Sequence, residues 1–275
     1  MTPSHRRFLT MLGLCTALGA VACATSPTGR KQLLLLPEDQ MNVMGAQAFD
    51  QAKKATPTES NPAWTEYVRC VATPLQVSAR DKLDVKSWEV VVFKDDTPNA
   101  FALPGGKIGV HTGLFKVALN DAQLAAVLGH EVGHVIARHG NERVSEAGLA
   151  QGGLTVLNAI LGGGQGDTKR DLLLAALGVG AQVGVLMPHG RNQESEADII
   201  GLDLMARSGF DPQQSVELWK NMIKATQGGS PPEFLSTHPA SENRIKNLES
   251  KMAETMPKYQ KAVETSKTPV CHRPS

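Results

Sequence analysis

Apolar residues recur at helical spacing along much of the chain, and this pattern predicts most of its elements. Capping signals bound the predicted helices, such as Asn120 or Asp121 before the third of them and Gly209 after the fourth. We expect helices over residues 38–55, from residue 62 onwards, and over 121–140, 192–207, 212–226 and 240–254.

Two short segments show a different pattern that is typical of strands. Residues 88–93 are rich in β-branched and aromatic side chains, and residues 107–111 follow the turn-forming sequence Pro104-Gly105-Gly106. These segments predict a small antiparallel sheet. Together with the helical segments, they predict an α+β domain that is mainly helical.

The start of the chain has the layout of a secretory signal peptide. His5-Arg6-Arg7 precede an apolar stretch that runs to Ala22 and is too short for a comfortable membrane span. We therefore expect a signal peptide over residues 1–22, a tether over 23–36, and a single domain with a C-terminal tail over 37–275.

The end of this leader resembles a bacterial lipobox. Ala20-Val21-Ala22 stand directly before Cys23, which would become the lipidated first residue of the mature protein. The next residue is Ala24 and not aspartate, which favours transport to the outer membrane of a Gram-negative bacterium. We expect a periplasmic protein held to the membrane by an acyl anchor. Secretion without lipid is the alternative, because Ala20 stands where leucine is usual.

A second apolar stretch lies in the middle of the chain. A glycine-rich loop over residues 162–166 precedes residues 172–187, which are apolar but interrupted by three glycines and a glutamine. A buried hairpin helix is the interpretation that fits this length, with interfacial contact to a membrane as the alternative.

Charge and cysteine content narrow the partners and the compartment. The 28 Lys and Arg residues nearly balance the 27 Asp and Glu residues, without a basic stripe, so nucleic acid is not an expected partner. Cys70 and Cys271 are suited to one disulfide in an oxidising periplasm, which would pin the C-terminal tail to an early helix. Two unpaired thiols are the alternative.

The strongest chemical signal is His130-Glu131-Val132-Gly133-His134, inside the third predicted helix. Residues four apart lie on one face of a helix, so both imidazoles can reach one metal ion. Glu131 can then reach a water molecule on that metal without binding the ion. The motif predicts one Zn²⁺ per chain.

A third zinc ligand is expected from a later acidic segment. Glu194 and Asp198 are four residues apart at the start of a predicted helix, so they share a face. Glu194 can bind the metal while Asp198 accepts a hydrogen bond from a ligand imidazole. Glu196 points elsewhere on this helix. A solvated acidic first turn, favoured by the helix dipole, is the alternative.

Motifs spread over the chain resemble those of a known family, the membrane-associated zinc metallopeptidases that include HtpX and the CAAX prenyl protease. The likeness is strongest to their periplasmic branch with LoiP, YcaL and the protease domain of BepA. The sequence departs from the family at Pro188-His189-Gly190-Arg191, where we interpret His189 as a surface residue. The matching motifs are Thr28-Gly29-Arg30, residues 99–106, the HExxH segment with Ala137-Arg138-His139, Glu194 to Asp198, and Ser236-Thr237-His238-Pro239 with Arg244.

This resemblance implies a gluzincin-like zincin fold with zinc held by His130, His134 and Glu194. It also implies that Glu131 is the general base and that Asp198 contacts a zinc ligand without binding the metal itself. His139 is interpreted as structural.

Two further residues are candidates for the chemistry itself. Negative charge develops on the carbonyl oxygen during peptide hydrolysis, so His238 and Arg244 are candidates to stabilise it. His238 has a second possible role as a fourth zinc ligand in a resting enzyme, and the sequence leaves both roles open.

The substrate-binding element is expected to be a strand at the edge of the sheet. We assign this role to the residues of the second predicted strand, where an extended substrate would add by main-chain hydrogen bonds. These residues are Lys107, Ile108, Gly109, Val110 and His111.

Such binding suits a zinc endopeptidase that cleaves misfolded or misassembled cell-envelope proteins. The alternative function is a chaperone-like assembly lipoprotein that holds unfolded outer-membrane proteins, with gated or secondary proteolysis. The natural substrate, the cleavage specificity and the oligomeric state stay open.

Overall fold

The computed structural model describes residues 23–150, 190–226, 234–235, 238, 242–265 and 267–274. The expected signal peptide, the apolar segment over residues 162–187 and His189 lie outside these described residues. Within them, no helix combines the length and the apolar character needed to cross a membrane.

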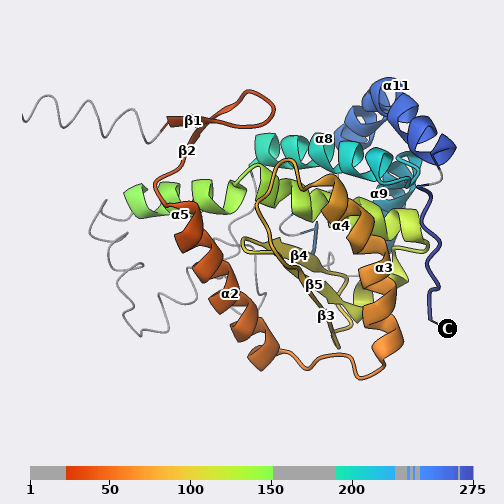
Figure 1. Cartoon of the computed structure of the whole chain (residues 1–275), viewed down its shortest axis with the longest axis horizontal. Helices are drawn as coiled ribbons and strands as arrows, with labels where there is room; N and C mark the ends of the chain where they lie inside the picture. The colour runs from red at the N-terminus through yellow and green to blue at the C-terminus, as the bar shows by residue number, and fades with distance from the viewer. Residues whose placement is uncertain are drawn as a thin grey trace, which may run out of the picture.

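The described chain is mainly helical, with two small sheets (Figure 1). This confirms the expected mainly helical α+β fold. The helices are α2 (Glu38–Ala55), α3 (Pro62–Ser78), α4 (Asp121–Ile136), α5 (His139–Ala150), α8 (Arg191–Arg207), α9 (Gln213–Thr226) and α11 (Glu242–Glu264), with a 3₁₀ turn η1 (Thr112–Lys116). The strands are β1 (Cys23–Thr25), β2 (Lys31–Leu33), β3 (Glu89–Phe93), β4 (Ala100–Leu103) and β5 (Lys107–His111).

The helix that carries HExxH ends earlier than the sequence predicts. Helix α4 begins after Asn120, whose side chain accepts a hydrogen bond from the Gln123 amide at 2.9 Å. It ends at Ile136 and not near Gly140, because Arg138 adopts a left-handed conformation with φ of 57°. The chain turns there, and α5 begins as a separate helix.

The three-stranded sheet differs from the expected one in its order and pairing. Strand β5 lies in the centre, parallel to β3 and antiparallel to β4. The prediction that Lys107–His111 form an edge strand of an antiparallel sheet is therefore wrong. Both sides of β5 are paired, because the chain leaves β3, forms β4 and turns through Gly105 and Gly106 into the gap between them. Both glycines have positive φ, of 80° and 76°.

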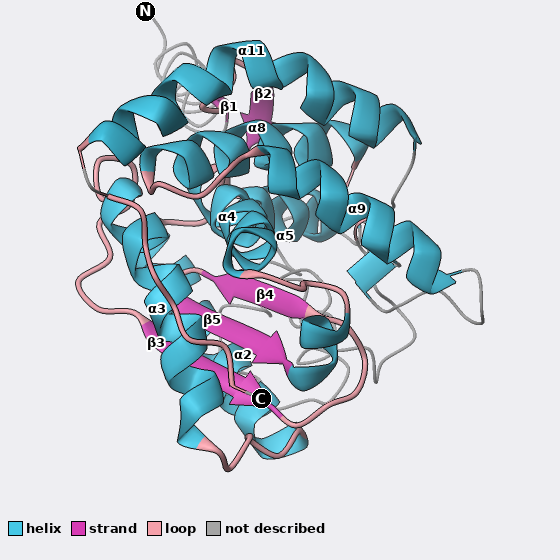
Figure 2. Cartoon of the chain, turned by 90° about the vertical axis from the view of Figure 1, so that its right-hand side faces the viewer, coloured by secondary structure: helices cyan, strands magenta, loops and turns pink. Residues whose placement is uncertain are grey.

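Helices α4, α8 and α11 lie on one side of this sheet (Figure 2). Helix α4 is sandwiched between the sheet and α8, and it is buried along nearly its whole length. A helix that is apolar on most faces is expected to be buried in this way. The metal-binding motif is therefore held inside the domain and not on its surface.

The segment expected as a tether contains an ordered two-stranded ribbon. Strands β1 and β2 pair antiparallel, with Cys23 opposite Leu33, and Gly29 with φ of 92° lies in the turn between them. The side chain of Gln32 donates a hydrogen bond to the Ala137 carbonyl at 2.9 Å. This ribbon, residues 23–33, is docked on the end of α4 and on α5.

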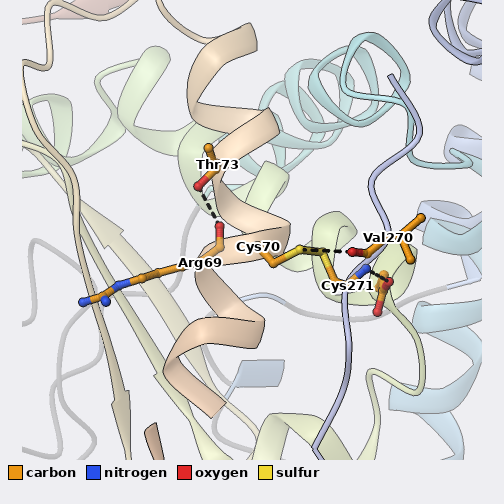
Figure 3. The surroundings of a disulfide bond; sticks show 6 residues. Arg69, Cys70, Thr73, Val270 and Cys271 are labelled. Atoms are coloured by element: carbon orange, nitrogen blue, oxygen red, sulfur yellow. Dashed lines mark hydrogen bonds between the residues drawn. A yellow bond between two sulfur atoms is a disulfide. The ribbon is translucent and has the colours of Figure 1, made fainter. Parts of the chain in front are cut away.

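The C-terminal tail is fixed to α3 by a disulfide. Cys70 and Cys271 are bonded, with their Cα atoms 5.8 Å apart, which confirms the expected pairing (Figure 3). The tail is also held by Arg273, which donates to the Phe115 carbonyl at 2.6 Å. The bond joins residues that are 201 positions apart in the sequence.

Replacing both cysteines, as Cys70→Ser with Cys271→Ser, is expected to lower the free energy of unfolding by about 2–4 kcal/mol, because the unfolded chain loses a long covalent loop. Denaturant unfolding followed by circular dichroism measures this change. Reductant should lower the unfolding midpoint of the wild-type protein and leave that of the double variant unchanged. A wild-type midpoint that does not respond to reductant would contradict the prediction.

Candidate zinc site

The two histidines of HExxH point from α4 towards a common centre. The Nε2 atoms of His130 and His134 are 3.0 Å apart, and both residues are buried. Their spacing of four residues places them one helical turn apart on the same face, as the sequence predicts.

Two more residues complete this centre from other parts of the chain. Glu194, in the first turn of α8, places Oε1 3.3 Å from His134 Nε2 and Oε2 3.5 Å from His130 Nε2. His238 places Nδ1 2.9 Å from Glu194 Oε1 and 3.1 Å from His130 Nε2. One potential ligand atom from each of the four residues lies within 4.8 Å of the others.

The chemistry of this group fits a zinc ion. Imidazole nitrogens and a carboxylate oxygen are the donors that Zn²⁺ prefers, and four of them match its tetrahedral coordination. Beside them, Glu131 Oε1 is buried and has no hydrogen-bond partner in the described part of the chain. Glu131, His134 and His238 also line one cleft. The group thus suits one metal ion with an adjacent carboxylate that is free to act on a water molecule.

A second layer of charged side chains supports the ligands. Asp198 Oδ1 lies 2.9 Å from His130 Nδ1, the hydrogen bond that the sequence predicts. Arg244 donates to Glu194 Oε2 and to Asp198 Oδ1, each at 2.7 Å, and its guanidinium lies over the Trp219 ring at 3.7 Å. Arg244 is therefore engaged with the side chains that surround the centre.

Burial and neighbouring charges shift the pKa values of the acidic groups in opposite directions. Burial raises the pKa of the Glu131 carboxyl above its ordinary value, although nearby His238 and His130 oppose this. Burial also raises the pKa of Glu194, but His238 and His130 outweigh it and hold that pKa well below the usual range. Burial has the same effect at Asp198, where Arg244 and His130 outweigh it and lower the pKa. Glu194 and Asp198 are thus carboxylates, whereas Glu131 is the stronger base.

The sequence of residues 62–252, more than half of the chain, matches peptidase family M48. The chain belongs to this family. The match confirms the expected family of zinc metallopeptidases, and the buried group of three histidines and one glutamate is the candidate metal site of this M48 domain.

Named relatives agree with this assignment. The mitochondrial metalloendopeptidase OMA1 of Schizosaccharomyces pombe is 39% identical over 180 residues, which are 65% of this chain and 50% of the relative. The beta-barrel assembly-enhancing protease of Escherichia coli is 30% identical over 223 residues, which are 78% of this chain and 44% of the relative. The chain spans about half the length of these curated relatives.

The cleft beside the candidate zinc site lies away from β5, the strand that was expected to bind substrate. Lys107 pairs with Glu89 at 2.8 Å, and Ile108 and Val110 are buried in the core. The cleft is lined instead by Phe101 and Ala102 of β4. The sequence pattern did not indicate a strand there, because this apolar segment is only four residues long and its partner is chosen by the fold.

Two buried titratable residues beside the site, His139 and Glu196, were not expected as functional candidates. His139 Nδ1 lies 2.8 Å from His134 Nδ1, and His139 Nε2 lies 3.2 Å from Glu196 Oε2. His139 was expected to be structural, and Glu196 was expected to point away from the metal. Only the turn after α4 brings His139 back onto the ligand His134, and no sequence spacing signals that turn.

Glycines allow α4 and α8 to approach closely enough to share a metal ion. A Cβ atom added to Gly201 would lie 2.9 Å from the backbone nitrogen of His130, and one added to Gly133 would lie 2.8 Å from the Ala197 carbonyl oxygen. These separations are shorter than van der Waals contact, so a methyl group would push the helices apart. The close crossing is what places Glu194 beside the two histidines.

The variant Gly201→Ala is expected to weaken zinc binding by about tenfold or more, because pushing α8 away from α4 moves Glu194 relative to the two histidines and distorts the coordination geometry. Zinc content after dialysis against a chelator series measures this effect. Gly190→Ala is the matched control, since a Cβ atom there meets no atom within 4 Å. Equal zinc retention by both variants would contradict the prediction.

Proposed function

We propose that this protein is a zinc-dependent endopeptidase that hydrolyses peptide bonds in misfolded or misassembled cell-envelope proteins. The observation that carries the proposal is the buried group of His130, His134, Glu194 and His238 next to Glu131, whose buried Oε1 has no hydrogen-bond partner among the described residues. A ligand group of this kind, with a base beside it and a cleft in front, is suited to the attack of water on a peptide carbonyl.

In this mechanism His130, His134 and Glu194 hold the zinc. When bound, the zinc supplies a Lewis acid that activates water and polarises the substrate carbonyl. Glu131 accepts a proton from the attacking water as the new C–O bond forms. It then delivers that proton to the amide nitrogen as the C–N bond breaks, so that a carboxylate and an amine leave.

Arg244 acts on this chemistry through the ligands. Its guanidinium donates to both Glu194 and Asp198, and Asp198 contacts His130. Arg244 was expected as a stabiliser of developing charge, and these contacts favour a role in positioning the ligand carboxylate. The stabilising role then falls to His238.

His238 is suited to regulate the enzyme. Its Nδ1 lies among the zinc-ligand atoms, and its Nε2 lies 3.5 Å from Glu131 Oε1. We propose that it is the fourth ligand in a resting state and moves aside when substrate enters. Its imidazole would then donate to the oxygen on which charge develops.

The edge of β4 that pairs with no other strand of the described residues is the proposed binding site for the substrate backbone. The His111 amide donates to the Asn99 carbonyl at 2.9 Å, so Asn99 and every second residue after it face β5. The backbone groups of Ala100 and Ala102 therefore point away from β5. Ala102 lines the catalytic cleft, where an extended peptide would add as a further strand.

The compartment is proposed from the leader sequence and the disulfide. A signal peptide over residues 1–22, lipidation at Cys23 and an acyl anchor would place the protein in the periplasm, at the outer membrane of a Gram-negative bacterium, like LoiP and YcaL. The bond between Cys70 and Cys271 is typical of an oxidising compartment. The tether and the domain would then occupy residues 23–36 and 37–275.

A second candidate function is that of an assembly factor that holds unfolded outer-membrane proteins. The name of the Escherichia coli relative, a beta-barrel assembly-enhancing protease, favours it, as does the position of His238 among the ligands. In this case proteolysis would be gated and secondary.

The variant Glu131→Gln is expected to lower the rate of casein cleavage by about 10²–10⁴-fold, because an amide cannot accept the proton of water. Zinc content should stay that of the wild-type protein, since Glu131 is not a ligand. The control is Glu66→Gln, which makes the same change at an exposed position of α3. Equal turnover by Glu131→Gln and the wild type would contradict the peptidase mechanism.

The variant His238→Ala tests the role of His238. We expect this variant to bind zinc and to change the rate of casein cleavage. The rate should increase if His238 mainly blocks the site, and it should decrease if His238 mainly stabilises charge.

A separate measurement decides between the two functions. Suppression of the aggregation of an unfolded outer-membrane β-barrel by Glu131→Gln would support the assembly function. Its absence would leave proteolysis as the function.

Backbone addition at β4 predicts a periodic response to N-methylation of a peptide substrate. Methylation of an amide that pairs with Ala102 should raise KM by up to about tenfold, the value of one hydrogen bond, whereas methylation of the next amide should have little effect. Steady-state kinetics on a set of singly methylated peptides measures this. A response without alternation would contradict strand addition.

A further inference from the structure

An unbroken line of hydrogen bonds joins the N-terminal ribbon to a zinc ligand. Thr28 donates to Glu196 Oε1 from its amide at 3.2 Å and from its hydroxyl at 2.8 Å, and Arg30 Nε donates to Glu196 Oε2 at 3.2 Å. The same Oε2 atom lies 3.2 Å from His139 Nε2. The other nitrogen of this imidazole, Nδ1, lies 2.8 Å from His134 Nδ1.

The donor and the acceptor of each hydrogen bond between Glu196 and His134 can be assigned, starting from the Glu196 carboxylate. A carboxylate only accepts hydrogen bonds, so His139 Nε2 carries the proton that it shares with Glu196. A neutral His139 then accepts at Nδ1, and His134 Nδ1 must be the donor. His134 Nε2 is left with its lone pair, and it faces Glu194 and His130 in the zinc group.

Burial and charge support this assignment. His139 and Glu196 are almost fully buried. Thr28 and Arg30 donate to the two oxygens of Glu196, so this carboxylate acts as an acceptor. A proton on both nitrogens of His139 would make His134 Nδ1 the acceptor and leave the proton of His134 on Nε2. Zinc binding by His134 Nε2 therefore requires a neutral His139 that donates to Glu196.

Helix α8 contributes to the metal centre from two faces. Residues two apart on a helix point about 200° from each other, so Glu194 and Glu196 lie on opposite sides of α8. Glu194 reaches the ligand group directly, whereas Glu196 faces the ribbon and His139. Arg30 also donates through Nη2 to Glu142 on α5 at 2.7 Å, so the ribbon bridges both helices.

We propose that Glu196 and His139 are positioning residues that fix the tautomer and orientation of His134, and that Thr28 and Arg30 hold them in place. Zinc affinity then depends on the contacts that Thr28 and Arg30 of the ribbon make with Glu196. The proposal rests on zinc binding by His134, which is part of the proposed function. Supporting hydrogen bonds of this kind raise the basicity of a ligand and fix its geometry.

Two substitutions at His139 test the relay. Zinc affinity is measured on the metal-free full chain by competition with a chromophoric chelator, and the visible absorption of the Co²⁺-substituted protein reports the geometry of the site. His139→Phe keeps the ring but removes the acceptor, so zinc affinity should fall by about 10–100-fold with an altered Co²⁺ spectrum. His139→Asn places Oδ1 near the former Nδ1 and should restore most of the affinity.

Variants of Glu196 and of the ribbon test the longer connection. Glu196→Gln and Arg30→Gln should each weaken zinc binding and shift the Co²⁺ spectrum. Gln32→Met is the matched control, because Gln32 is a buried ribbon residue whose hydrogen bond goes to the Ala137 carbonyl and not to Glu196. It should lower stability without changing the Co²⁺ spectrum.

The outcomes separate this proposal from the proposed function, because zinc affinity is measured without substrate. Wild-type affinity and an unchanged spectrum in His139→Phe would overturn the relay. A loss in Gln32→Met equal to that in Arg30→Gln would overturn the specific role of the contacts that Arg30 and Thr28 make with Glu196. Circular dichroism checks the fold, and if Glu196→Gln does not fold, the two His139 variants decide the relay. Full zinc loading without proteolysis would contradict only the endopeptidase.

Discussion

The close crossing of α4 and α8 is the constraint on which the rest of the structure depends. One helix supplies both histidines and Glu131, and the other supplies Glu194, so the site exists only if their backbones nearly touch. Gly133 and Gly201 make that contact possible, because a methyl group at either position would meet the facing backbone. The metal-binding motif is thus as much a packing motif as a set of ligands.

This crossing buries several carboxylates, and buried charges are costly unless they are paired. Each side of α8 receives an arginine from a distant part of the chain. Arg244 comes from α11 and pairs with Glu194 and Asp198, whereas Arg30 comes from the ribbon and pairs with Glu196 and Glu142. Segments near both ends of the described chain therefore contact α8, the helix that carries Glu194. The charges that make the site chemically useful are stabilised by the same long-range contacts that complete the fold.

In the proposed function, regulation and substrate binding would meet at the cleft lined by Glu131 and His238. His238 and Glu131 face each other there, and Ala102 presents the free edge of β4. An incoming substrate strand would pair with the edge of β4 and then displace the His238 imidazole. Binding of the substrate backbone and movement of His238 would thus be coupled. A peptidase of this design would act on extended chains and spare folded ones.

The sequence alone determined whatever depends on neighbours along the chain. Helix caps, the pair of histidines four residues apart, the spacing of Glu194 and Asp198, and the suitability of Cys70 and Cys271 for a disulfide all follow from local geometry or composition. The tertiary structure decided which strand has a free edge, because β5 gains partners on both sides only when β3 and β4 assemble around it. It also decided that His139 meets both His134 and Glu196, since a left-handed Arg138 turns the chain back and places together residues 57 positions apart. Such contacts depend on how whole elements pack, and no local pattern encodes that packing.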